Sequence, residues 1–214
     1  LTAKKKSRYE KDIVFYDRYT LAHQLMETIL RERYSLIIKE NYQDIPWNEL
    51  EDYDVFILAA SGKLRPEETD EIWISAGQEE LIEKYVSNGG KLLVLHCGLA
   101  DFSTEGVLRK VVKGHFLEHP EEHPEITIKP VDNQLISIEG IEEFEIVDEL
   151  YFVDVDLEDT TIFLEAASEE YGTAIAGWAH RYGEGKVYCL TPGHTLRVFQ
   201  QEMMKKLILK GVEW

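Results

Sequence analysis

Cysteine and long apolar runs are scarce in this sequence. Its 214 residues include only two cysteines, Cys97 and Cys189. Two cysteines give no disulfide framework, so we expect both to be free thiols in a reducing cytoplasm. No apolar run approaches the ~20 residues that a membrane-spanning helix needs. The basic segment Lys4-Lys5-Lys6 leads into polar residues and not into the apolar core of a signal peptide. We therefore predict a cytoplasmic location.

Positive charge is also scarce. The chain has 23 Lys and Arg residues against 41 Asp and Glu residues, which gives a net charge of −18. Binding to nucleic-acid phosphates requires clustered Lys and Arg, so we expect no nucleic-acid partner. Anionic membrane surfaces also attract basic segments, so we expect no membrane partner. The main consequence of the acidic excess is solubility.

The order of apolar segments predicts one α/β domain over residues 1–214. Strand-like and helix-like patterns alternate in the first half, with strands at 12–16, 34–38, 53–60 and 92–95 and helices at 19–32 and 75–88. This alternation is typical of βαβ units and a mostly parallel sheet. Late in the chain, two strand-like segments flank Gly183-Glu184-Gly185, which predicts a β-hairpin.

The apolar run Leu92–Leu95 breaks off into His96-Cys97-Gly98. Ligands of open α/β sheets bind outside the carboxyl ends of the strands, so His96 and Cys97 are candidate site residues. A nucleophilic Cys needs thiolate character and exposure, and an elbow between strand and helix would expose Cys97. A structural thiol at a strand end is the alternative. Cys189 lies inside an apolar strand and is expected to be structural.

Two other segments place polar groups at predicted strand ends. Glu149 follows Asp148 between apolar neighbours, and an acid placed there must either meet solvent or be paired. It could act as a general acid or base, bind a metal or orient a histidine. His194 follows Thr191-Pro192-Gly193 at the end of a strand. Its ring can change protonation near neutral pH.

Three histidines, His115, His119 and His123, are spaced four residues apart. Pro120 and Pro124 argue against a regular helix there, and a solvated loop is the alternative to a functional role. Imidazole and carboxylate ligands suit zinc or a similar divalent ion, which makes such a metal the candidate cofactor. The candidate ligands are His96, His115, His119, Glu149 and His194.

Several motifs in this order resemble the ThuA-like (trehalose utilisation) family of the class I glutamine amidotransferase-like superfamily. The matching stretches are residues 85–98, 114–120, 148–151, 185–194 and 210–214, so that the resemblance covers roughly residues 50–214. It implies a flavodoxin-like, mostly parallel sheet with helices on both faces and a late hairpin. It also places Cys97 on an elbow after a central strand and His194 after the hairpin.

The chain departs from the amidotransferases in ways that bear on its activity. The amidotransferase Cys is usually flanked as Gly-x-Cys-x-Gly, but here the sequence is Leu95-His96-Cys97-Gly98-Leu99. An acid follows the amidotransferase His by two residues, whereas this position is Leu196. The resemblance therefore argues against glutaminase activity. The residues more typical of the ThuA-like family are His96, Glu149 and His194. The family's first-strand histidine has its nearest equivalent in His23.

The resemblance implies a role in carbohydrate utilisation, and we expect a small sugar or sugar derivative as the partner. In an enzyme, His194 would be the acid or base, Glu149 its partner, His96 a substrate- or metal-binding group and Cys97 an accessory or nucleophilic thiol. The candidate substrate-binding residues are Tyr151, Trp178, Tyr19 and His119. Two alternatives stay open, a non-catalytic sugar- or partner-binding regulatory module and a metal-dependent hydrolase. Self-association into a homo-oligomer is left open as well.

Overall fold

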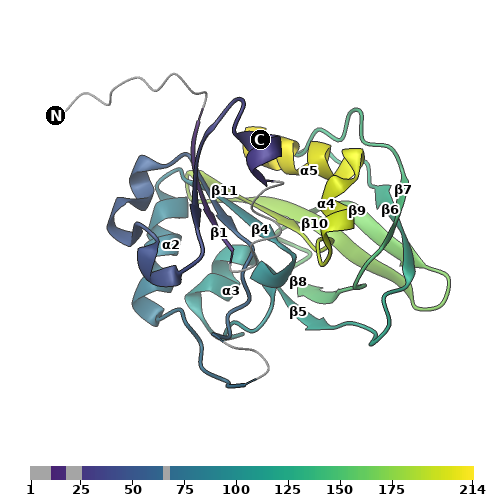
Figure 1. Cartoon of the computed structure of the whole chain (residues 1–214), viewed down its shortest axis with the longest axis horizontal. Coiled ribbons are helices and arrows are strands. Elements are labelled where there is room, and N and C mark those ends of the chain that lie inside the picture. The colour runs from purple at the N-terminus through teal and green to yellow at the C-terminus, as the bar shows by residue number, and fades with distance from the viewer. Residues whose placement is uncertain (1–10, 18–25, 65–67) are drawn as a thin grey trace.

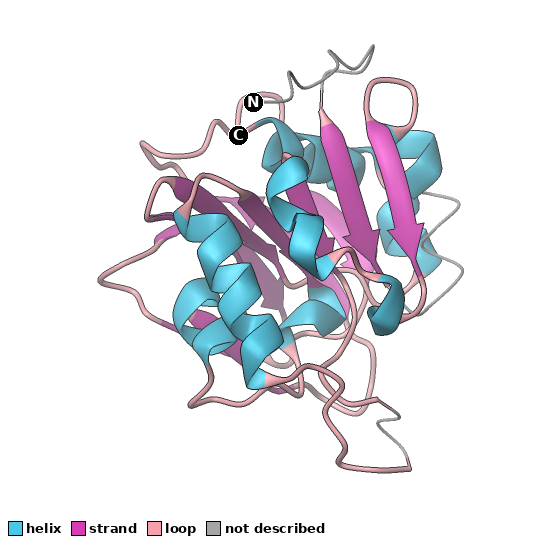
Figure 2. Cartoon of the chain, turned by 90° about the vertical axis from the view of Figure 1, so that its left-hand side faces the viewer, coloured by secondary structure: helices cyan, strands magenta, loops and turns pink. Residues whose placement is uncertain are grey.

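A computed structural model describes residues 11–17, 26–64 and 68–214, so the candidates Tyr19 and His23 lie outside the described residues. One large sheet runs through the molecule with helices on both sides (Figures 1 and 2). The strands are β1 (Asp12–Tyr16), β2 (Ser35–Lys39), β3 (Val55–Leu58), β4 (Lys91–Leu95), β5 (Gly114–Glu118), β6 (Glu125–Pro130), β7 (Phe144–Val147), β8 (Phe152–Val155), β9 (Thr161–Ser168), β10 (Gly172–Tyr182) and β11 (Gly185–Leu190). The α-helices are α2 (Ala76–Ser87), α3 (Val107–Val112), α4 (Leu196–Gln200) and α5 (Glu202–Glu213), and residues 26–30 are also helical. The 3₁₀ helices are η1 (Tyr42–Asp44), η2 (Trp47–Asp52) and η3 (His96–Leu99).

The described strands form a nine-stranded sheet in the order β2-β1-β3-β4-β11-β10-β9-β6-β7. From β2 to β11 all neighbours are parallel, and from β11 to β7 all are antiparallel. The α/β class is confirmed, and the large sheet is mixed, with the predicted parallel part from β2 to β11 and an antiparallel part from β11 to β7. The reason lies in the connections, because a parallel crossover needs a dozen or more residues. Only Gly183 and Glu184 separate the paired residues Tyr182 and Gly185.

The central strand β4 shows why its sequence is an unbroken apolar run. Every one of its residues is buried. Alternate side chains point to opposite faces, so that Leu93 and Leu95 pack with α5 while Leu92 and Val94 pack with α2 and α3. A strand covered on both faces has no polar side to alternate with.

The helices begin where local or tertiary capping groups are available. Ser75 and Gln78 form a reciprocal capping box at the start of α2, the helix that the pattern of residues 75–88 predicts. In contrast, the N-cap of α3 is Gly106, which has no side chain to cap the helix. The buried carboxylate of Glu79 accepts a hydrogen bond from the backbone N–H of Leu108 at 3.1 Å. Within the described ranges, no helix has the length and apolar character needed to cross a membrane.

A second, two-stranded sheet lies beside the large one. Strands β5 and β8 pair antiparallel and lie close to β4 and β10 in Figure 1. Neither strand was expected from the sequence pattern. Residues 119–124, which join β5 to β6, and residues 148–151, which join β7 to β8, are thereby brought to the carboxyl end of β4. This arrangement assembles the candidate site.

Candidate active site

The sharp turn after β4 is centred on His96. His96 has a φ of 40°, in the left-handed region, and it begins η3. The residue with the strained backbone in this elbow is therefore His96, and Cys97 follows it in the same turn. A Cβ at Gly98 would lie 2.3 Å from the carbonyl oxygen of Leu58, so only glycine lets this turn pack against β3. His96 and Cys97 line the same cavity.

The His96 ring is almost completely buried and is fixed from β11. Its Nδ1 lies 2.7 Å from the carbonyl oxygen of Thr191. A carbonyl oxygen can only accept, so Nδ1 carries the proton and donates. This contact leaves Nε2 on the other side of the ring, 3.1 Å from Oε2 of Glu149. A backbone carbonyl therefore decides which His96 nitrogen is offered to the site.

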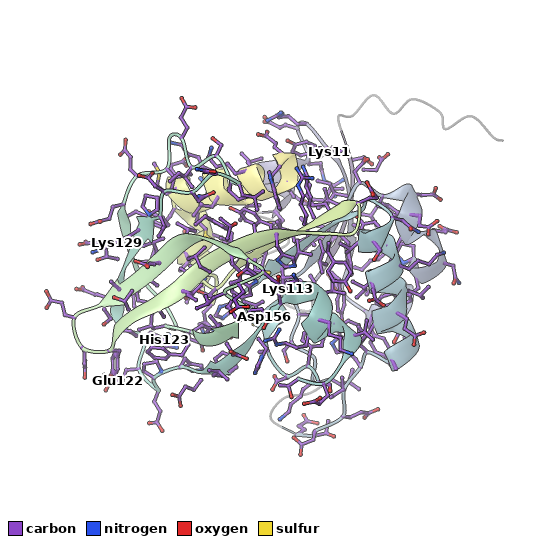
Figure 3. All side chains as sticks on the ribbon, turned by 180° about the vertical axis from the view of Figure 1, so that it is seen from behind. Lys11, Lys113, Glu122, His123, Lys129 and Asp156 are labelled. Atoms are coloured by element: carbon purple, nitrogen blue, oxygen red, sulfur yellow. The ribbon has the colours of Figure 1, made fainter. Side chains whose placement is uncertain are left out.

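Four imidazole rings surround the carboxylate of Glu149, whose side chain is 11% exposed. Besides His96, the Nδ1 atom of His194 lies 3.2 Å from Oε1. The Nε2 atoms of His119 and His123 lie 3.6 Å and 3.7 Å from the same oxygen. The two closer rings come from strand ends, and the other two come from the loop between β5 and β6, on which Figure 3 labels His123. The closest and best-fixed group is thus His96–Glu149–His194.

The neighbouring acid, Asp148, has a different environment and a different role. Its side chain is fully buried. It accepts hydrogen bonds from the backbone N–H groups of Gly193, at 2.8 Å, and of His194, at 3.1 Å. Burial raises the pKa of Asp148, and these two N–H groups oppose the rise. Asp148 therefore holds the backbone that carries His194, while Glu149 meets the ring.

The charges of the site follow from burial and from these contacts. Burial opposes ionisation of Glu149, but the facing His96 ring prevails and lowers the pKa of Glu149 to about 2. Burial likewise disfavours a charged His96, but Cys97 and Glu149 prevail and raise the pKa of His96 to about 10. Burial lowers the pKa of His194, and the charge on His96 adds to this effect. Near neutral pH, His194 is therefore a neutral imidazole beside a carboxylate and an imidazolium.

A cavity of about 410 Å³ opens beside these rings. This volume lies within the range of ~300–1,000 Å³ that is typical of small-molecule sites. Its polar lining residues are Asp17, His96, Cys97, His194 and Thr195. Asp17, which follows β1, is buried and was not predicted, because a single acid after a strand has no distinguishing sequence pattern. Glu149 does not line the cavity but lies behind the rings of His96 and His194.

Two predicted sugar-binding aromatics have other roles. Trp178 is fully buried, and its indole N–H donates to the carbonyl oxygen of Val112 at 2.9 Å, so its assignment to substrate binding is wrong. Tyr151 is 5% exposed. Its ring stacks on His96, with centroids 4.2 Å apart, and on His119, at 5.8 Å. Tyr151 therefore positions histidine rings and has no open face for a sugar.

The histidine series is divided by the fold. His115 accepts a hydrogen bond from Nε of Arg109 at 2.9 Å and lies near Asp154, so it does not belong to the group around Glu149. His119 and His123 do approach Glu149. Among the described residues, the group suited to hold a metal consists of His96, Glu149 and His194, whose ligand atoms lie within 4.8 Å of one another. The spacing of four residues gave no means to separate these histidines.

The comparisons with known proteins agree with this architecture. A ThuA-like protein from Bacteroides uniformis has a TM-score of 0.72 and 14% identity, over 95% of this chain and 89% of its own. A cytoplasmic protein from Salmonella typhimurium has a TM-score of 0.70 and 16% identity, over 95% and 98%. A β-galactosidase from Bacillus circulans sp. alkalophilus has a TM-score of 0.62 and 16% identity, over 95% of this chain but 30% of its own.

At these identities the solved structures share the fold alone. None of the curated proteins matches the chain. The sequence model of the family described as ThuA, trehalose utilisation, matches residues 16–214. Since this match covers almost the whole sequence, the chain belongs to the ThuA family.

Proposed function

We propose that this protein is an enzyme that acts on a sugar or sugar derivative and uses His194 to transfer a proton. The observation that carries the proposal is the pairing of His194 with Glu149. The two side chains meet at 3.2 Å, and the His194 side chain, 39% exposed, also lines the cavity. A base that is oriented by a second group and open to a cavity is the arrangement that acid–base catalysis requires.

The protonation states define the role of each residue. The Glu149 carboxylate is an acceptor only, so it favours the His194 tautomer with its proton on Nδ1. The lone pair of Nε2 is then available to remove a proton from the substrate. The lowered pKa of His194 keeps that nitrogen unprotonated near neutral pH. The neighbouring His96 imidazolium would stabilise negative charge that develops on the substrate.

The sugar class is supported by the family and not by the site geometry alone. The family is described by trehalose utilisation, and one structural neighbour is a β-galactosidase. We extend a sugar substrate to this chain as part of the proposal, and likewise a location in the cytoplasm, where the Salmonella neighbour is described to be. Cys97, which lines the cavity, is assigned as an accessory thiol.

His194→Gln tests this assignment. Glucose, trehalose and other disaccharides and glycosides are incubated with the protein, and products are followed by proton NMR. Acid–base groups contribute typically about 10²–10⁴-fold, so we expect the variant to lose turnover at least about a hundredfold while it still binds the sugar. His115→Gln, outside the group around Glu149, is the matched control. A wild-type protein that binds sugars without turning over any of them would support the regulatory module instead.

A divalent metal site is the second candidate, and His96 provides the specific observation for it. Its buried Nε2 has no well-directed hydrogen bond from the described residues, although Oε2 of Glu149 lies 3.1 Å away. Tetrahedral zinc with bonds of about 2.0 Å places its ligand atoms about 3.3 Å apart. His96 and His194 lie 3.1 Å and 3.2 Å from different oxygens of Glu149, and the three ligand atoms lie within 4.8 Å of one another, so a bound ion would draw the group closer together. The bond from Nδ1 to Thr191 is the outer-shell contact that metal-binding histidines usually make. Three protein ligands would leave a position for the water of a metal-dependent hydrolase.

The two candidates assign opposite roles to Nδ1 of His194, and metal analysis separates them. We expect the proton-transfer enzyme to contain no stoichiometric metal, either as wild type or as His194→Ala. The metal-dependent hydrolase instead predicts about one ion per chain in the wild type and its loss in His194→Ala. Elemental mass spectrometry of protein purified without chelator measures both, with His115→Ala as the control that should retain any ion bound at Glu149.

A further inference from the structure

We infer that the cavity beside His194 binds an apolar group attached to the sugar, so that the preferred ligands are glycosides with an aryl or alkyl aglycone. The sugar part of this inference rests on the proposed function. The apolar part rests on the cavity walls alone. Among the residues that the structure describes, the apolar ones in these walls, here named the apolar chamber, are Phe15, Met26, Ala59, Leu95, Leu196 and Phe199.

The polar and the apolar lining residues of the cavity come from different parts of the fold. The polar groups follow the carboxyl ends of strands, as His96 follows β4 and His194 follows β11. The chamber residues come from β1 and β4, from Ala59 just after β3, from residues 26–30 and from α4. Phe15 and Met26 are fully buried and belong to the core cluster on the α5 face of the sheet. Ala59 and Leu196, which are partly exposed, form the accessible apolar surface of the cavity, and Phe15 and Met26 back it from the core.

An unsubstituted sugar fits this apolar surface poorly. Hydroxyl groups project from all sides of a disaccharide, and a hydroxyl buried without a partner is strongly disfavoured. The chamber side chains offer no hydrogen-bonding group. In contrast, apolar cavities take up aromatic molecules readily. A ligand with a sugar beside the polar lining residues and an apolar group in the chamber satisfies both parts of the cavity.

The inference can be tested by binding, without turnover. Methyl and phenyl glucosides of the same anomer share their sugar and differ only in the apolar group. Burial of an aromatic ring favours binding by about tenfold or more. We therefore expect isothermal titration calorimetry to give at least a tenfold lower Kd for the phenyl glucoside. Both anomers are measured, and phenol alone is the third probe.

A substitution that fills the apolar chamber should abolish the preference for the phenyl glucoside over the methyl glucoside. Ala59 lines the chamber just after β3, and Ala59→Leu adds carbon there without changing a polar group. The milder Ala59→Val is made in parallel, so that a folding defect in the first variant does not prevent the test. Ala76→Leu makes the same chemical change at an exposed position in the first turn of α2. It should keep the wild-type preference.

The results separate this inference from the proposed function. Loss of the phenyl preference in the Ala59 variants, with retention in Ala76→Leu, supports the chamber even if no substrate is turned over. Phenol binding that follows the same pattern also supports it. Equal binding of the two glucosides by the wild type would overturn it, as would an unchanged preference in folded Ala59 variants or no binding of any probe. If the protein turns over sugars but binds the methyl and phenyl glucosides equally, the proposed function is supported and the role of the apolar chamber is contradicted.

Discussion

Glu149→Gln should destabilise the protein by about 3–5 kcal/mol, the effect typical of removing one member of a buried ion pair. The glutamine has nearly the shape of the glutamate but no charge to balance His96. The His96 ring is only 3% exposed and 3.1 Å from the carboxylate, so water cannot replace the lost partner. We therefore expect the pKa of His96 in the variant to fall far below its wild-type value of about 10. Imidazole chemical shifts in a pH titration by NMR measure this fall.

The loss of stability should depend on pH in a defined way. The pKa of Glu149 is lowered from 4.5 to about 2, so its contribution is complete above pH 4.5 and is lost as the pH falls through about 2. The pKa of His96 is raised from 6.5 to about 10, so its contribution is complete below pH 6.5 and is lost as the pH rises through about 10. The contact between Glu149 and His96 contributes to both shifts, and Cys97 also contributes to that of His96. The difference between wild type and variant should therefore be largest between pH 4.5 and pH 6.5.

Urea unfolding from pH 3 to pH 9, in buffer with a chelator, measures the difference in the free energy of unfolding between wild type and Glu149→Gln. The chelator ensures that the ion pair is measured and not a bound metal. Glu145→Gln, an exposed position on β7, makes the same chemical change without touching the site. Its unfolding free energy should stay within about 0.5 kcal/mol of the wild type. If the profiles of Glu149→Gln and wild type run parallel from pH 3 to pH 9, the ion pair does not contribute as described.

Asp148→Ala should be the second severe change, although the Asp148 side chain does not itself line the cavity. The substitution leaves the N–H groups of Gly193 and His194 without their acceptor. An unsatisfied buried donor costs about 1–3 kcal/mol. Because two donors lose their acceptor, we expect the free energy of unfolding to fall by roughly twice this amount. Asp148→Asn keeps one acceptor oxygen but turns its amide toward a backbone donor, and an intermediate loss is expected. Thermal unfolding measures both variants.

The position of His194 provides a second measurement for Asp148. If Asp148 holds this backbone, the His194 ring resonances should shift or broaden in Asp148→Ala, while those of His180, buried far along the sheet, stay unchanged. Glu145→Ala is the matched control for removal of an acid. A variant as stable as the wild type, with an unchanged His194 ring, would show that the loop is held by other contacts.

Adjacent acids thus have separate roles that their environments decide. Asp148 is enclosed by backbone donors, whereas Glu149 is enclosed by imidazole rings. The sequence placed both acids between apolar neighbours and predicted that Glu149 must either meet solvent or be paired. It did not indicate which acid would face a ring. The turn that follows a strand decides in which directions neighbouring side chains point.

The sequence by itself determined the α/β class. It also determined that the polar candidate residues lie at the ends of strands. A run such as Leu92–Leu95 is expected to be buried on both faces. The candidate site residues are then expected at its carboxyl end, beginning with His96. The same logic placed Glu149 and His194 at strand ends. These conclusions depend on local periodicity and on the burial of apolar side chains, both of which can be read along the chain.

Only the tertiary structure decided which of these groups meet. It brought His123 to Glu149 and took His115 to Arg109, although both belong to one evenly spaced series. It buried Trp178 and placed Phe199 in the cavity wall. The physical reason is that periodicity reports how deeply a residue is buried but not which distant residue it contacts. Those contacts follow from strand order, from the antiparallel half of the sheet and from the unpredicted pair β5 and β8.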